Sequence, residues 1–303
     1  METFNTQFLY SIIIIAIGYG FKRWNIIKEQ DGEAISRIIF NITLPSVIIF
    51  TFHNIKIEHS LLMLVVLGFL YGIIVAVLGL FLFRNETRRD KGMLGMLIPG
   101  FNIGLFAFPL VEGIWGDTGL KYFGMFDVGN AVVTFGISYL IGSYYSKEGV
   151  VLDYKHVLGK MSKSIPLMTY MVVFIINISG LHLPSGVIQV TSIVSKANMP
   201  LSLLLLGIYL NFTFEKSYWK GIGKVLGLRY GTGLALGILS FYLLPVEDMF
   251  RYTVLIALIL PMASSVLIYS IEFKYNQRFV GTAANLSILL SFLLVWVIGN
   301  MLV

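Results

Sequence analysis

The chain has 303 residues, of which 57% are hydrophobic and 13% charged, and its mean hydropathy is +0.83. A soluble domain of this length cannot bury so much apolar surface, so the composition indicates a membrane protein. The net charge of +6 comes from basic residues dispersed over short loops, which excludes nucleic acid as a partner and favours contact with anionic lipid. The absence of cysteine excludes disulfides and thiolate metal sites.

Apolar segments follow one another along the whole chain. A membrane-spanning helix needs about 20 apolar residues, and the short loops leave no room for a separate soluble domain. No basic segment precedes the first apolar run, which therefore indicates a first span rather than a cleaved signal peptide. We predict an all-α polytopic membrane protein with ten transmembrane helices, near residues 6–23, 33–53, 60–83, 92–115, 119–145, 165–180, 187–212, 221–244, 250–272 and 279–302.

The basic residues predict the orientation of these spans. Of the 22 Lys and Arg residues, all but Lys56, Lys121, Lys196 and Arg251 lie in or beside the odd-numbered loops. Loops rich in Lys and Arg stay in the cytoplasm. We therefore expect a multi-pass protein of the cell (plasma) membrane with both termini outside the cytoplasm.

A weak internal repeat divides the spans into two halves. With five spans in each half, the second half must be inverted relative to the first. The predicted organisation is a first five-helix repeat in residues 1–145, a cytoplasmic linker in 146–164 and a second, inverted repeat in 165–303. A shift of 155 residues aligns Asn41 with Lys196, Thr43 with Asn198, Pro45 with Pro200, and Asn130 with Asn285.

The fourth and ninth spans are poor continuous helices. The fourth contains Pro99 and Pro109, and the ninth contains Pro261. Proline removes a backbone donor and clashes with the preceding turn. Interrupted spans at matching positions of two halves indicate a transport site at their crossing. The alternative is a pair of proline kinks, with small residues that serve helix packing.

Several phrases of the sequence resemble those of the auxin efflux carrier family, in the same order and over nearly the whole chain. Asn102-Ile-Gly104 followed by Phe108-Pro109-Leu110 is similar to the Asn-x-Gly…Pro-Leu signature of that family. The other similar stretches are Gly18-Tyr-Gly20 through Ile42-Thr-Leu-Pro45, Asp127-x-Gly129-Asn130, Ala197-Asn-Met-Pro200-Leu-Ser202, and Leu260-Pro261 through Tyr275-Asn276.

The resemblance implies a fold and a substrate class. The family includes bacterial permeases for malate or malonate and the plant PIN auxin exporters, and its fold resembles that of bile acid:sodium symporters. It implies two inverted five-helix repeats, with helices 4 and 9 broken and crossing, and a carboxylate as substrate. The chain departs from plant members in the run Val266-Leu-Ile-Tyr269, where they have a second proline.

Polar residues inside the spans are the candidate site. Asp127 and Lys196 are predicted at similar depth. One possibility is that they form an ion pair. The other is that they act separately: Lys196 would neutralise carbonyl ends or attract an anion, and Asp127 would bind a proton or a sodium ion. Asn285 and Asn130 suit packing as well as binding. The substrate- or ion-binding candidates are Asn41, Thr43, Asn102, Gly104, Pro109, Asp127, Asn130, Lys196, Asn198, Pro261, Ser264 and Ser265.

These features favour a secondary active transporter (permease) of a small organic anion. The rivals are a cation/proton antiporter, a bile-acid-type sodium symporter, and an intramembrane enzyme or sensor. The four histidines lack metal-ligand spacing, and no phosphate loop or nucleophile motif is present. No catalysis, cofactor or metal is expected, and the coupling ion is either a proton or sodium. The expected partners are the organic anion and the bilayer, and a homodimer is an alternative to a monomer.

Overall fold

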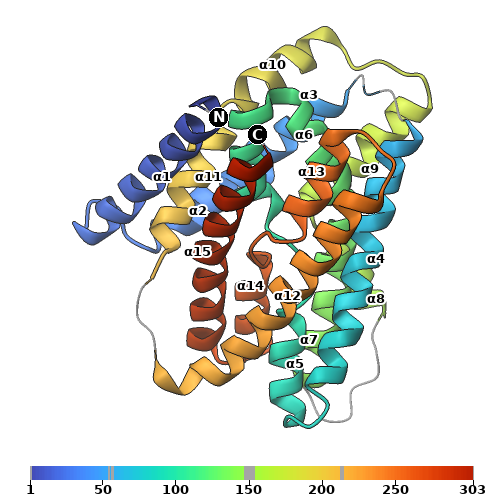
Figure 1. Cartoon of the computed structure of the whole chain (residues 1–303). Coiled ribbons are helices and arrows are strands. Elements are labelled where there is room, and N and C mark those ends of the chain that lie inside the picture. The colour runs from blue at the N-terminus through green and yellow to red at the C-terminus, as the bar shows by residue number, and fades with distance from the viewer. Residues whose placement is uncertain (1, 54, 56–57, 147–153, 212–214, 303) are drawn as a thin grey trace.

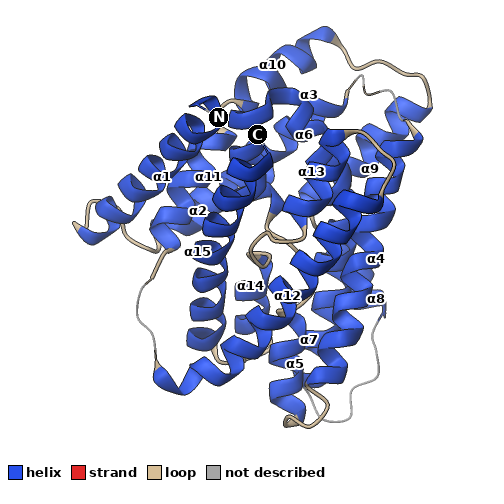
Figure 2. Ribbon diagram, in the orientation of Figure 1, coloured by secondary structure: helices blue, strands red, loops and turns tan. Residues whose placement is uncertain are grey.

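A computed structural model describes residues 2–53, 55, 58–146, 154–211 and 215–302 (Figure 1). The described residues form helices and no strand (Figure 2). In the first half of the chain the helices are α1 (Glu2–Arg23), α2 (Asp31–Ile38), η1 (Ile39–Thr43), α3 (Leu44–Phe52), α4 (His59–Leu82), α5 (Arg88–Met96), η2 (Ile103–Ala107), α6 (Phe108–Val132), η3 (Val133–Ser138) and α7 (Tyr139–Ser146).

The second half of the chain is also helical. Its helices are α8 (Tyr154–Ser162), α9 (Ile165–Ile178), α10 (Ser185–Ser195), α11 (Asn198–Tyr209), η4 (Lys216–Tyr218), α12 (Trp219–Leu243), α13 (Asp248–Ala257), α14 (Ser265–Glu272) and α15 (Gln277–Leu302). Helix α8 lies in the segment predicted to be a linker, whose residues 147–153 are outside the described part of the chain.

Among the described residues, seven helical segments are long and apolar enough to cross a membrane. Such a set is what a multi-pass membrane protein requires. Helix α9 is apolar but shorter, and lies within the predicted span 165–180. The segments are Phe4–Arg23, Asp31–Phe52, His59–Leu82, Ile103–Ser146, Ser185–Tyr209, Lys216–Leu243 and Gln277–Met301.

The structure has fewer long apolar helices than the ten predicted spans, and each remaining difference has a local cause. The predicted spans 92–115 and 250–272 contain helix interruptions, so neither is one long helix. The predicted spans that meet between 115 and 119 are joined in the long segment Ile103–Ser146. Within it, Gly116 has φ 57° and ψ −142°, so the backbone leaves the helical conformation at that residue.

Apolar side chains cover the outside of the bundle as well as its interior. Phe81, Ile193 and Tyr242 are 64%, 71% and 78% exposed, respectively. A lipid-facing surface accounts for these exposed side chains, since lipid tails are as apolar as they are. Inside the bundle, α4 and α6 pack backbone to backbone. A Cβ atom at Gly129 would lie 2.8 Å from the Phe69 nitrogen, so only glycine permits this approach.

The two ends of the described chain lie side by side (Figure 1). The Asn5 Nδ2 atom donates a 2.8 Å hydrogen bond to Asn300 Oδ1, which joins α1 to α15. The first and last helices therefore close the bundle at one end.

Candidate functional site

Two helices are interrupted inside the bundle, at the prolines that the sequence singles out. Helix α5 ends at Met96 and η2 begins at Ile103, with Pro99 between them. Helix α13 ends at Ala257 and α14 begins at Ser265, with Pro261 between them. The second gap appears in Figure 2 as a loop in the middle of the bundle. We call residues 97–102 and 258–264 the two crossing segments.

The two crossing segments contact each other. Phe101 and Met262 form an antiparallel bridge. The Asn102 backbone N–H donates a 2.9 Å hydrogen bond to the Pro261 carbonyl. The Asn102 side chain adds a second link, since its Nδ2 atom donates to Ser264 Oγ at 2.9 Å. The predicted site residues Asn102, Pro261 and Ser264 are therefore in one place.

Each crossing segment is held by polar side chains from a helix later in the chain, α6 for the first segment and α15 for the second. Asn130 Oδ1 accepts from the Phe101 N–H at 2.8 Å, and Asn130 Nδ2 donates to the Phe101 carbonyl at 3.0 Å. On the other segment, Ser287 Oγ accepts from the Met262 N–H at 3.2 Å and Ser291 Oγ donates to the Ile259 carbonyl at 2.7 Å. Backbone groups that leave a helix inside a membrane need such partners, so Asn130 supports the crossing.

A buried arginine joins the two segments from one side. Arg229 of α12 is 3% exposed, and its Nη1 donates to the carbonyls of Leu97, at 3.1 Å, and Ile98. Its Nη2 donates to the Leu260 carbonyl at 3.3 Å. These carbonyls follow the C-terminal ends of α5 and α13, where the helix dipole is negative. The guanidinium therefore compensates two negative helix ends at once.

Sequence reasoning used Arg229 only to orient the loops and missed this role. A signal was present, because residue 229 lies inside the predicted span 221–244 and a charge inside a span is costly. From the sequence, the neutralisation of carbonyl ends is one of the possible roles of Lys196. In the structure, Arg229 does it.

The positive helix ends at the crossing meet neutral groups. Asn102 Oδ1 accepts from the Leu105 N–H at 3.3 Å and so caps η2. Ser264 precedes α14 and makes no side-chain cap. In the part of the chain that the structure describes, no carboxylate accepts a hydrogen bond from the first N–H groups of η2 or α14. Helix N-termini of this kind attract anions.

Three other predicted site residues lie in the helical elements that follow the crossing segments. Gly104 in η2 packs against α3, where an added Cβ would lie 2.8 Å from Leu44 Cδ2. Pro109 is buried at the beginning of α6, directly after the π-helical turn η2. Ser265 is the first residue of α14 and is half-buried. All three belong to the elements that leave the crossing.

Thr43 and Asn198 form a separate contact between η1 and α11. The Thr43 Oγ1 donates a 3.0 Å hydrogen bond to Asn198 Oδ1, and the two residues are 3% and 0% exposed. Asn41, two residues earlier in η1, is exposed and lies on the outside. The structure therefore places two of these three candidates together and Asn41 apart.

Asp127 is linked to the crossing through Asn130. Its Oδ1 accepts from Asn130 Nδ2 at 2.9 Å, and its Oδ2 accepts from the Tyr170 hydroxyl of α9 at 3.1 Å. Within the described residues, no ion pair joins Asp127 to Lys196. The predicted pairing of these two charges is therefore not found.

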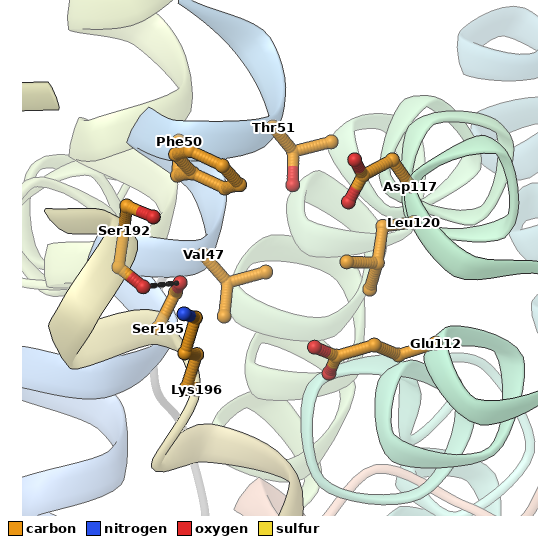
Figure 3. A pocket seen from close by; sticks show the side chains of 9 residues that line it. All are labelled: Val47, Phe50, Thr51, Glu112, Asp117, Leu120, Ser192, Ser195 and Lys196. Atoms are coloured by element: carbon orange, nitrogen blue, oxygen red, sulfur yellow. Dashed lines mark hydrogen bonds between the residues drawn. The ribbon is translucent and has the colours of Figure 1, made fainter. Parts of the chain in front are cut away.

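Lys196 lies in the turn between α10 and α11, is exposed, and lines a pocket of about 140 Å³. Figure 3 shows its amine on one side of the pocket and the carboxylates of Glu112 and Asp117 on the other. The remaining lining residues are Val47, Phe50, Thr51, Leu120, Ser192 and Ser195. In the described chain, no cluster of three or more His, Asp or Glu residues suits a metal ion.

Known proteins agree with a transport role. The chain is 25% identical to an uncharacterized transporter of Methanocaldococcus jannaschii, over 96% of this chain and 98% of that protein. It is 23% identical to an uncharacterized transporter of Methanothermobacter thermautotrophicus, over 92% of each chain. The model of the family described as membrane transport protein matches residues 4–298. The chain therefore belongs to that family, the auxin efflux carrier family that its motifs resemble.

Proposed function

We propose that the protein is a secondary active transporter that moves a small organic anion, a carboxylate, across the cell membrane. Substrate binds at the contact of the two crossing segments, and the two halves of the protein alternate access to it. Family membership supports the transport role, the resemblance to the auxin efflux carrier family supplies the carboxylate class, and the electrostatics of the crossing supports an anion.

The electrostatics of the crossing is the observation that carries this proposal. Four helix ends meet there, and Arg229 compensates the two negative ones. The positive ends begin next to Asn102 and Ser264, and no carboxylate of the described chain accepts a hydrogen bond from the first N–H groups of η2 or α14. An anionic substrate would complete this charge balance.

The rival functions fit this arrangement less well. A cation/proton antiporter needs an acidic group where its cation binds. At the crossing the side chains are Asn102, Ser264 and Arg229, and Asp127 reaches it only through Asn130. A bile-acid-type sodium symporter also carries an organic anion and differs in its coupling ion.

We further propose ten membrane crossings in two inverted five-helix repeats, with both termini outside the cytoplasm. Repeated contacts support this arrangement. The segment around Pro99 is held by Ser138, whose Oγ donates to the Pro99 carbonyl at 3.1 Å. The segment around Pro261 is held by Ser291 in the corresponding way, through the Ile259 carbonyl.

Counterflow into proteoliposomes tests the proposed function. Purified protein would be reconstituted with unlabelled malate or malonate inside the vesicles and the labelled acid outside. A matched set of vesicles would test methylammonium in the same way. We expect accumulation of a carboxylate, and its loss with Asn102→Ala. Asn300→Ala is the control, because Asn300 lies at the chain terminus and pairs with Asn5. Accumulation of the amine but of no carboxylate would refute the anion assignment.

A further inference from the structure

Asp127 is a carboxylate inside the bundle whose partners are neutral. It lies in the membrane-spanning segment Ile103–Ser146. Its hydrogen-bond donors are Asn130 and Tyr170, which are 3% and 1% exposed. A charge at such a place is costly unless it is paired, and intramembrane acids of this kind mark ion or proton pathways. Binding of the anion at the two crossing segments does not involve this carboxylate.

We propose that Asp127 is the proton-binding site of the transporter, and that its proton is carried together with the organic anion. This inference rests on the proposed function and names its coupling ion. Asn130 is the physical connection, because it bonds both to the Asp127 carboxylate and to the backbone of Phe101 in the crossing.

The geometry favours a proton over a sodium ion. Hard cations are bound by several oxygen ligands. Both neighbours of the carboxylate instead present donors to it, an amide N–H from Asn130 and a hydroxyl from Tyr170. The amide oxygen of Asn130 is already occupied by the Phe101 N–H. A proton needs no such cage, since it binds to one carboxylate oxygen.

The charged and titratable groups near α6 have other partners. Tyr170 of α9 is the titratable group that faces the carboxylate. No other titratable side chain in the described residues, on any element packed against α6, is hydrogen-bonded or ion-paired to Asp127. Tyr71 of α4 is hydrogen-bonded to Thr232, and Tyr122 of α6 donates to Glu247, which precedes α13. Arg229 donates to carbonyls of the crossing segments. Lys196, Glu112 and Asp117 line their own pocket.

Protonation would act on the crossing in two ways. The bond from Asn130 to an ionised carboxylate is charge-assisted, so it weakens when Asp127 takes up a proton. Asn130 Nδ2, which is shared between Asp127 and the Phe101 carbonyl, then shifts toward Phe101. In addition, a neutral Asp127 no longer repels an anion bound nearby. Proton and anion are therefore expected to bind together, as in a symporter.

The first test needs no transport substrate. Infrared spectra of the protein in lipid would be recorded from acid to alkaline pH, following the carbonyl stretch of protonated carboxyl groups. We expect a titrating band that is lost in Asp127→Asn and kept in Asp117→Asn, which changes an exposed acid on the same helix. Tyr170→Phe, which removes one donor, should shift the frequency of this band. A band unchanged in both Asp127→Asn and Tyr170→Phe would overturn the proposal.

The second test measures coupling in proteoliposomes. An inward proton gradient should raise wild-type uptake of malate or malonate and acidify the lumen, and a sodium gradient should not. Asp127→Asn should lose the response to the proton gradient, whereas Asp117→Asn should keep it. Sodium-driven uptake in the wild type, or a full proton response in Asp127→Asn, would overturn the proposal. A titrating Asp127 band with no carboxylate uptake would refute the proposed function and leave the proton site standing.

Discussion

Thr43 and Asn198 are joined by a 3.0 Å hydrogen bond, and they are 155 residues apart, which is the offset that aligns the two halves of the sequence. Residues related by a two-fold axis can contact each other only where they lie close to that axis. The contact is therefore what an inverted repeat would produce. It also couples the π-helical turn η1 to the start of α11, next to the turn at Lys196.

Removal of the Thr43 hydroxyl should destabilise the protein. In Thr43→Val the buried Asn198 side chain loses its partner, a cost of about 1–3 kcal/mol. Chemical unfolding in detergent would measure the loss. The control is Thr169→Val, because the Thr169 hydroxyl bonds within its own helix at a half-buried position. Equal stability of the two variants would show that the Thr43 contact contributes nothing.

Arg229→Leu should weaken the crossing. The carbonyls of Leu97, Ile98 and Leu260 lose a charged donor, and loss of one such hydrogen bond alone costs about 1.5–3 kcal/mol. Arg229→Lys keeps the charge but lacks the planar fork that reaches both segments, so we expect impaired transport with a smaller loss of stability. Thermal unfolding and uptake would be compared with those of Arg278→Leu, because the Arg278 side chain is 85% exposed. A wild-type melting temperature and uptake rate in Arg229→Leu would refute the role.

Asn102→Ala should lower transport by at least about tenfold, equivalent to about 1.4 kcal/mol, while folding is retained. The reason is that the amide bonds Ser264 and caps η2 at the proposed substrate site. Ser264→Ala removes only the hydroxyl and should have a smaller effect. Initial uptake rates at matched expression would decide. A near-normal rate in Asn102→Ala would exclude this side chain from the site.

The topology can be tested because the chain has no cysteine. Lys163→Cys, at an exposed position between α8 and α9, should react with an impermeant thiol reagent only from the cytoplasm. Ser185→Cys, at the exposed start of α10, should react only from outside. Labelling of intact cells and of inverted vesicles would show this. Reaction of both cysteines from the same face is incompatible with the proposed orientation.

The interrupted helices were predictable from the sequence because their cause is local. Pro99 and Pro261 remove backbone donors, and the structure has a gap in the helix at each of them. The membrane class was equally predictable, because it depends on composition. Asn102 and Ser264 are predicted to belong to the binding site because they lie near these prolines. The structure brings the two side chains together.

The partners of the charged residues were not predictable in the same way. The sequence gives the depth of a residue along a helix, but not the direction in which its side chain points. Asp127 and Lys196 were matched by depth alone, whereas the carboxylate contacts Tyr170 and the amine lines a different pocket. Arg229 was assigned to a loop margin, and only packing of α12 against both crossing segments shows its role.

A thermal-shift screen of the purified protein tests the central claim, anion binding at the crossing, most directly. The screen would compare mono-, di- and tricarboxylates with amines of similar size and with sodium and potassium chloride. A ligand at 100 times its Kd stabilises the folded state by about 2.7 kcal/mol. We predict that at least one carboxylate raises the melting temperature of the wild type and not of Asn102→Ala. Stabilisation by amines or alkali cations but by no carboxylate would contradict the account.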